Sequence, residues 1–219
     1  FTIEDLASFE YHKLPSRFHL IARDAFNGCE LWRKPLRDWY KTRAYVKFVP
    51  TQLQRRIAAI GDKVYCTMGY TEPIQAFDAA TGRELMTFAG THTTAEFIHD
   101  RGVLYAIVGE PYGPAGSRGK SVTLKAIDAE VGARKWEKTI PGYVGGTLAA
   151  KNSSVFYCTN TEIVRCDVAS GRIIWSAETP GLDVQPAKWI KGTRKRTKGP
   201  LGGKDNLSPT LVVTDDMLY

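Results

Sequence analysis

The feature that most constrains the fold of this chain is a short pattern that occurs four times along it. The pattern is an aspartate, three residues, a glycine, three further residues and a tryptophan. It aligns without gaps over residues 20–36, 74–90, 124–140 and 163–179. The aspartates are Asp24, Asp78, Asp128 and Asp167, the glycines are Gly28, Gly82, Gly132 and Gly171, and the tryptophans are Trp32, Trp136 and Trp175, with Met86 in the second unit. Such self-similarity indicates a repeat architecture in which each unit packs on its neighbours.

A second pattern precedes each later unit. Residues 58–65, 97–105, 149–157 and 212–219 each read as an apolar run, a polar turn and another apolar run, which is typical of a β-hairpin. The two patterns together predict four strands per unit. In the second unit we expect them at 56–60, 63–68, 73–78 and 83–88. Residues 1–36 are expected to supply only the latter half of a unit, and 208–219 the start of a truncated one.

Each residue of the pattern has a structural reason. The glycine closes the third strand onto the fourth, where a positive φ is needed. The aspartate accepts hydrogen bonds from the amides of the turn. The tryptophan offers a large flat surface to the neighbouring unit. These roles predict that the pattern serves packing, so the tryptophans are not assigned to cofactor stacking.

The spacing of the units fixes the fold class. Successive glycines lie 54, 50 and 39 residues apart, and the shortest spacing is close to the ~40 residues of a bare four-stranded blade. Residues 37–54, 110–120 and 178–207 account for the surplus. Helical periodicity is almost absent. The sequence therefore predicts an all-β chain, a partial β-propeller over residues 1–219 with about four blades of four antiparallel strands.

The units resemble the repeats of PQQ-like, or quinoprotein-type, β-propellers, whose signature is Ala-x-Asp-x-x-Thr-Gly-x-x-x-Trp. Residues 76–82 match its first part fully, and Met86 departs at the tryptophan position. The other units keep the tryptophan but replace the threonine by Asn27, Val131 and Ser170, and Arg165 stands at one alanine position. The characteristic sequence motifs of WD40 and kelch repeats are absent from the chain.

This resemblance implies a ring of seven or eight blades, so the chain is expected to be a fragment of a larger protein. It also implies a periplasmic or cell-surface location. We expect a non-catalytic scaffold or binding module in an exported bacterial protein, with a protein or small-molecule ligand at the propeller loops. No cofactor is evident under this interpretation.

The alternative is a fragment of an alcohol or sugar dehydrogenase that uses PQQ and calcium. Such an enzyme needs a cationic clamp, a stacking tryptophan, oxygen ligands for calcium and an aspartate base. Many also carry adjacent cysteines, which this chain lacks. The sequence identifies no catalytic, cofactor-binding or metal-binding residue. His12, His19, His92 and His99 lack metal-ligand spacing, and the Asp215–Asp216 pair fits a solvated hairpin turn.

The four cysteines, Cys29, Cys66, Cys158 and Cys166, show no zinc or CxxC spacing. Free thiols in strands are the simplest interpretation. A disulfide between Cys158 and Cys166 is the alternative, if the two residues lie opposite each other in a hairpin.

The net charge of +7 is uneven, because residues 188–204 hold seven basic residues and no acidic one. This segment is either a solvated insertion or a weak contact for an anionic surface. No fold for specific nucleic-acid binding accompanies it. The Gly-rich loop 109–119 lacks the GxxxxGK[ST] residue order of a phosphate-binding loop. It either covers a binding surface or is a neutral insertion. The apolar run 103–108 is far shorter than the ~20 residues of a membrane-spanning helix.

Overall fold

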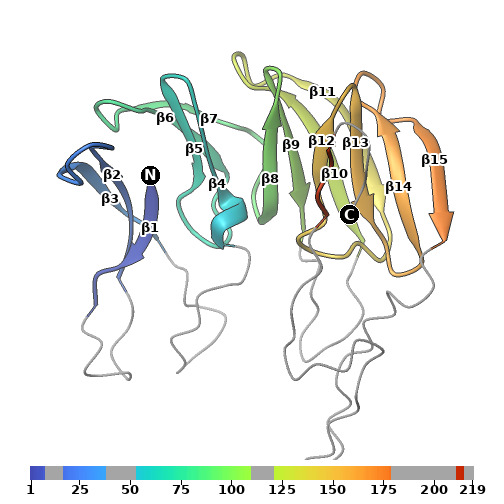
Figure 1. Cartoon of the computed structure of the whole chain (residues 1–219), viewed down its shortest axis with the longest axis horizontal. Helices are drawn as coiled ribbons and strands as arrows, with labels where there is room; N and C mark the ends of the chain where they lie inside the picture. The colour runs from blue at the N-terminus through green and yellow to red at the C-terminus, as the bar shows by residue number, and fades with distance from the viewer. Residues whose placement is uncertain (8–16, 38–52, 110–120, 179–210, 215–219) are drawn as a thin grey trace, which may run out of the picture. The chain divides into compact units, whose positions relative to one another are not determined.

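The computed structural model describes residues 1–7, 17–37, 53–109, 121–178 and 211–214. These residues form four antiparallel sheets and one short 3₁₀ helix (Figure 1). The chain divides into two compact units, residues 1–97 and 98–219, and the boundary falls inside strand β8. In the part of the chain that is described, no helix has the length and apolar character needed to cross a membrane.

Each sheet is a meander, in which strands that follow one another in sequence are neighbours. The first sheet has three strands, and the other three have four strands each. The strands are β1 (Thr2–Asp5), β2 (Phe18–Arg23) and β3 (Glu30–Pro35); β4 (Ile57–Ile60), β5 (Lys63–Thr67), β6 (Ile74–Asp78) and β7 (Glu84–Thr87); β8 (Thr94–Asp100), β9 (Val103–Val108), β10 (Val122–Asp128) and β11 (Arg134–Ile140); and β12 (Ala149–Lys151), β13 (Ser154–Cys158), β14 (Glu162–Asp167) and β15 (Ile173–Glu178). The 3₁₀ helix η1 (Leu53–Arg56) precedes β4.

The prediction of an all-β chain with four-stranded antiparallel blades is confirmed. In the second sheet, every predicted strand agrees with the observed one to within one residue at each end. The first unit differs from its prediction. Residues 1–36 form three strands and not the latter half of a blade, because β1 pairs with β2 from Thr2↔Ile21 to Asp5↔Phe18. The strand has only four residues, too few to show an alternating pattern.

The burial pattern differs between the inner and outer strands of the sheets. The second strands β5, β9 and β13 are apolar runs with both faces largely buried. The outer strands β3, β7 and β15 are mostly exposed. A strand that is covered on both faces loses the polar alternation of a half-buried strand. In the first unit, Leu20 of the first sheet packs in one buried cluster with Val64 and Phe77 of the second sheet.

The four pattern segments 24–28, 78–82, 128–132 and 167–171 form one kind of loop, which we call the signature turn. In all four turns the glycine has a φ of 68–73°, and its amide donates to the aspartate carbonyl at 2.8–3.0 Å. Each turn is followed by a register shift that marks a β-bulge. A bulge with a left-handed glycine is a common way to close such a hairpin. The predicted backbone role of the glycine is therefore confirmed.

The aspartate side chains also act as predicted. Oδ1 of Asp24 accepts from the amides of Phe26 and Asn27 at 2.9 and 3.0 Å. Oδ1 of Asp78 accepts from both the amide and the hydroxyl of Thr81, at 2.8 and 2.7 Å. These bonds lower the pKa of the Asp78 carboxyl, because they favour its charged form.

The four cysteines are free thiols, and the proposed disulfide is wrong. Cys158 and Cys166 lie on paired strands, but Cys158 faces Ile163 and Cys166 faces Val155. The tight turn in which the Thr159 amide donates to Glu162 O fixes this register. The two sulfurs therefore lie at different positions along the ladder.

Several predictions fall outside the described residues. They concern the loop 110–120, the basic segment 188–204, His12 and the Asp215–Asp216 pair. Of the expected further blade at 208–219, only 211–214 are described. There Leu211 is buried against Phe156 and Cys158, with Val213 beside it.

Candidate functional site

The tryptophans of the pattern join neighbouring blades at their signature turns. In the first unit, Trp32 on β3 donates its indole N–H to Ala79 O at 2.9 Å, and Ala79 lies in the next signature turn. The ring covers Gly82, where an added Cβ would lie 2.8 Å from Cδ2 of Trp32. The predicted packing role of Trp32 is confirmed.

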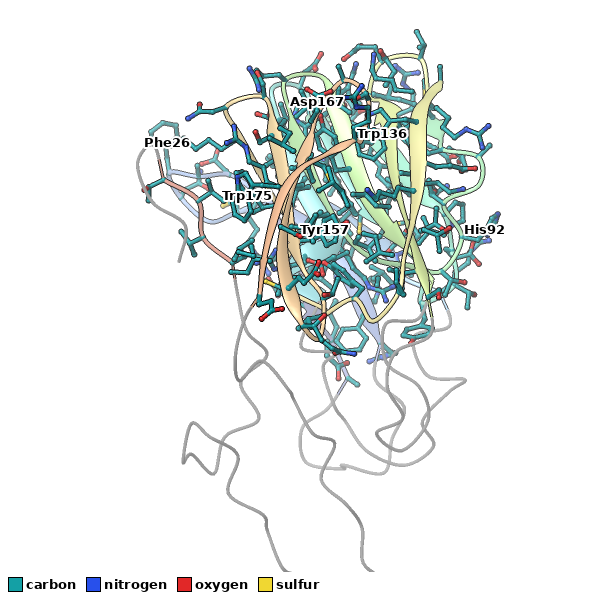
Figure 2. The ribbon with its side chains drawn as sticks, turned by 90° about the vertical axis from the view of Figure 1, so that its right-hand side faces the viewer. Phe26, His92, Trp136, Tyr157, Asp167 and Trp175 are labelled. Atoms are coloured by element: carbon teal, nitrogen blue, oxygen red, sulfur yellow. The ribbon has the colours of Figure 1, made fainter. Side chains whose placement is uncertain are left out.

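The same contact is repeated in the second compact unit. Trp136 on β11 donates to Val168 O at 2.7 Å, and a Cβ on Gly171 would lie 2.6 Å from Cε3 of its ring. Figure 2 shows Trp136 beside Asp167, which begins that turn. The tryptophans at these two positions therefore hold blades together, and neither ring is available to stack on a cofactor.

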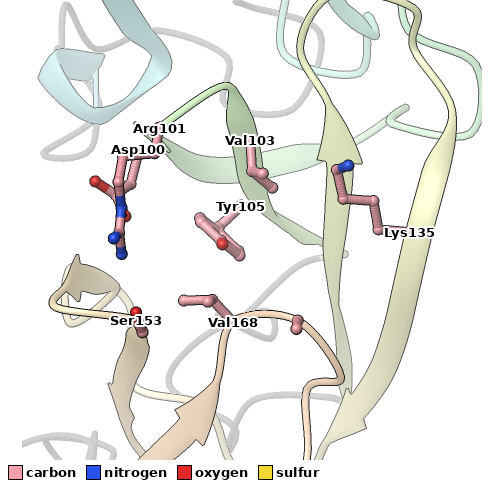
Figure 3. A pocket seen from close by; sticks show the side chains of 8 residues that line it. Asp100, Arg101, Val103, Tyr105, Lys135, Ser153 and Val168 are labelled. Atoms are coloured by element: carbon pink, nitrogen blue, oxygen red, sulfur yellow. The ribbon is translucent and has the colours of Figure 1, made fainter.

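A cleft of about 320 Å³ opens beside this second contact, at the ends of the hairpins (Figure 3). We call it the tip cleft. It lies between the β8–β9 turn, the β12–β13 turn and the signature turn 167–171. The residues that give it its chemistry are Asp100, Arg101, Tyr105, Lys135, Ser153 and Val168.

Two ion pairs border the tip cleft. Arg101 Nε lies 3.2 Å from Asp100 Oδ2, and Lys135 Nζ lies 3.0 Å from Asp128 Oδ2. The cationic side chains are 59% and 42% exposed, whereas their carboxylate partners are 25% and 27% exposed. Each ion pair is neutral as a whole, but its cation is more exposed than its carboxylate. The accessible surface of the cleft therefore carries more positive than negative charge.

The floor of the tip cleft is neutral. Tyr105 lies 6.0 Å from Trp136 between ring centroids, at a tilted angle. Burial raises the pKa of the Tyr105 hydroxyl to about 12, so this group stays protonated and can donate a hydrogen bond. The described lining contains no histidine or cysteine, and its one lysine is in an ion pair. The cleft can bind a polar group, and its lining offers no paired nucleophile and base.

The tip cleft was not predicted from the sequence. The sequence predicts hairpin turns at 100–102 and 152–154, but no pattern in it indicates that these two turns lie beside each other. A partial signal exists in the backbone, since Arg101, Asn152 and Ser153 all have positive φ. Non-glycine residues in that conformation often mark functional turns.

A second cluster of charges is buried in the first unit. Arg55 NH1 lies 3.2 Å from Glu96 Oε2, and the Glu96 side chain is 1% exposed. Arg56, also buried, donates to Ala95 O and Tyr70 O at 3.1 Å each. Burial lowers the pKa of Arg56 to about 10. These bonds tie η1 to β8 and to the Tyr70 loop, which is a structural role.

The dehydrogenase alternative requires oxygen ligands for calcium. Asp24, Asp78, Asp128 and Asp167 use their carboxylates on their own turns or on Lys135. Within the described ranges, no three His, Cys, Asp or Glu side chains form a group that could hold a metal ion. His19 and His92 contact the carbonyl oxygens of Arg17 and Thr71.

The comparisons with known proteins give information on the fold of this chain. No protein-family model and no curated protein matches the chain. Among solved structures, BamB from Moraxella catarrhalis is 19% identical with a TM-score of 0.48, and the match covers 74% of this chain and 46% of that one. The quinohemoprotein alcohol dehydrogenase from Comamonas testosteroni is 19% identical with a TM-score of 0.47, over 74% of this chain and 32% of that one.

A second such dehydrogenase, from Pseudomonas putida, is 19% identical with a TM-score of 0.43, over 56% of this chain and 20% of that one. This chain thus spans between a fifth and about half of the length of these proteins. Its repeated antiparallel meander sheets, each with one signature turn, have the arrangement of β-propeller blades.

Proposed function

We propose that this chain is a non-catalytic propeller domain that binds a protein partner at the tip cleft, as part of a larger exported bacterial protein. The observation that carries the proposal is the asymmetry of the two ion pairs, in which Arg101 and Lys135 are more exposed than Asp100 and Asp128. Figure 3 shows Arg101 and Lys135 on either side of Tyr105, so acidic side chains of a partner can approach each cation. Tyr105 and Ser153 supply neutral hydroxyls beside them.

The shape of the cleft favours a protein segment over an enclosed small molecule. Small-molecule sites usually enclose most of their ligand in a deep pocket. The tip cleft is small and open, and hairpin turns border it. It can accept one or two acidic side chains of a partner loop. Propeller loops on a rigid scaffold are a common position for such recognition.

Calorimetric titration with a short glutamate-rich peptide tests this function. The chain is expected to bind that peptide and not a lysine-rich peptide of the same length. Arg101→Gln or Lys135→Gln should each weaken binding about tenfold, as expected for the loss of one charge-assisted hydrogen bond. Arg134→Gln is the matched control, because Arg134 precedes Lys135 on β11 but does not line the cleft. Equal binding by all variants would overturn the proposal.

The dehydrogenase alternative has a separate test. It requires that the protein binds PQQ with calcium and then reduces an artificial electron acceptor when an alcohol or sugar is added. Acceptor reduction that depends on both PQQ and calcium would replace the binding-module proposal.

A further inference from the structure

Tyr105, at the floor of the tip cleft, has a hydroxyl without a partner in the described part of the chain. The residue is 2% exposed, and its ring packs against Trp136. Among the residues that the structure describes, none forms a hydrogen bond with the Tyr105 hydroxyl. Figure 3 shows this hydroxyl in the middle of the residues that line the cleft. Because buried polar groups are nearly always hydrogen-bonded, the hydroxyl marks a place where a ligand atom is expected.

The protonation of Tyr105 indicates which ligand atom fits there. Its raised pKa keeps the hydroxyl protonated at neutral pH, so the O–H can donate to an acceptor atom of the ligand. Arg101 and Lys135 lie on either side of Tyr105, and they favour an acceptor that carries negative charge. A carboxylate oxygen meets both conditions.

Part of the lining of the tip cleft is apolar. Val103 and Val168 line it together with the Tyr105 ring, and both valines are half-buried. Trp136 fixes the position of Val168, because its indole N–H donates to Val168 O. A glutamate or aspartate side chain ends in its carboxylate and has no apolar branch to cover this surface. The last residue of a polypeptide carries a carboxylate and a side chain on one carbon atom, so it can fill the polar and the apolar part together.

We propose that the tip cleft holds the C-terminus of a partner polypeptide whose last residue is apolar and whose preceding residues are acidic. The terminal carboxylate accepts a hydrogen bond from the Tyr105 hydroxyl, and the last side chain covers Val168. Arg101 and Lys135 attract this carboxylate and the acidic side chains before it. The inference rests on the proposed function and names the part of the partner that the cleft binds.

The size of the cleft agrees with this occupant. Its volume of about 320 Å³ lies at the lower end of the range for ligand sites, which suits a chain end better than a longer segment. Capture of a terminal carboxylate is also a recurring mode of peptide recognition.

Calorimetric titration with three glutamate-rich peptides of equal length tests the proposal. The first peptide ends in valine with a free carboxylate, the second in valine amide, and the third in glycine with a free carboxylate. The first is expected to bind most tightly. The amide should bind about tenfold more weakly, because one charge-assisted hydrogen bond is lost. The glycine peptide should also bind more weakly, because it lacks the apolar contact.

Tyr105→Phe separates the hydroxyl from the rest of the cleft. This variant should bind the free-carboxylate valine peptide about tenfold more weakly than wild type does and the amide equally well. Its urea denaturation should match that of wild type, because the hydroxyl has no described partner to lose. Tyr65→Phe is the matched control, since Tyr65 is also 2% exposed but does not line the cleft. It should bind all three peptides as wild type does.

The outcomes separate this inference from the proposed function. Equal binding of the free-carboxylate peptide and its amide, or an equal loss of both in Tyr105→Phe, would overturn the inference and leave the proposed function standing. No binding of any glutamate-rich peptide would overturn both. N-acetylvaline should bind at least about tenfold more weakly than the valine peptide, because it lacks the acidic residues. Equal affinity would show that the cleft takes a small carboxylic acid, and it would overturn the polypeptide partner.

Discussion

Trp136 donates its indole N–H to the carbonyl oxygen of Val168 at 2.7 Å, and this bond joins two successive blades. Trp32 makes the equivalent bond to Ala79 O at 2.9 Å. Both rings lie on the glycine of the turn that they contact. The repeat needs its glycine for two reasons, since the residue adopts a positive φ and also leaves space for the indole of the preceding blade.

The indole bond should contribute measurably to stability. Trp136→Phe keeps an aromatic ring but leaves Val168 O without this donor, and we expect a loss of about 1 kcal/mol in the free energy of unfolding. Trp32→Phe should behave alike. Trp175→Phe is the control and should cost little, because no such bond joins Trp175 to a described residue. Urea denaturation monitored by circular dichroism measures the three values. Equal losses at all three positions would contradict the account.

The two reasons for glycine can be separated by substitution. Gly28→Ala meets open space, so only the backbone strain at φ +73° applies, and we expect a cost of about 1 kcal/mol. Gly82→Ala and Gly171→Ala also place a Cβ within 2.8 and 2.6 Å of an indole ring. Overpacking adds roughly 1–3 kcal/mol. Denaturation of the three variants should therefore rank Gly28→Ala as the mildest, and a similar cost for all three would count against the steric role.

The turn aspartates should make stability fall at acid pH. Hydrogen bonds lower the pKa of Asp78, Asp128 and Asp167 below the ordinary value of 3.8. A lowered pKa in the folded state means that the carboxylates stabilise the fold above their unfolded pKa and lose this effect as pH falls through the folded value. The melting temperature should therefore drop below about pH 4. The triple Asp→Asn variant keeps the acceptor oxygens, and its melting temperature should depend less on pH in that range.

The ion pair between the half-buried Arg55 and the buried Glu96 should be sensitive to loss of one partner. Arg55→Met leaves the Glu96 carboxylate buried without this cation, and such a change typically costs 3–5 kcal/mol. Adding Glu96→Gln removes the charge that was left behind, so the double variant should be more stable than Arg55→Met alone. Urea denaturation of the two single variants and the double variant gives the coupling energy. A coupling near zero would show that the two side chains do not depend on each other.

The thiols should differ in reactivity. Cys29 is exposed, whereas burial raises the pKa of Cys66 to about 12 and also raises that of Cys158 and Cys166. The thiolate is the reactive form. In the folded chain at pH 8, a thiol reagent should therefore label Cys29 rapidly and the other three only after unfolding. A Cys29→Ser variant should lose the rapid phase.

The sequence predicted those features that depend on local chemistry. The positive φ of Gly82 and the amide bonds to Asp78 follow from the turn itself, so the pattern was enough to predict them. The strand β1 was missed, because four residues cannot show a period. The relation of Cys158 to Cys166 was missed because the turn at Thr159–Glu162, and not the spacing of the cysteines, sets the register.

Features that join separate parts of the chain were harder to predict. The sequence indicated that Trp136 packs on a neighbouring blade, but not that its indole bonds to Val168 O. The tip cleft needs Arg101 and Ser153 from different hairpins, and no pattern in the sequence connects them. Glu96 reads as an ordinary surface charge, and only the packing of β8 against η1 shows that it is buried.

The charge of the tip cleft offers the most direct test of the proposed binding function. Calorimetric titration of an Arg101→Glu variant with the glutamate-rich and the lysine-rich peptide measures it. The account predicts that this variant loses binding of the glutamate-rich peptide and gains binding of the lysine-rich one, because the exposed charge at the cleft is reversed. Unchanged binding of the glutamate-rich peptide would contradict the assignment of the tip cleft as the binding site.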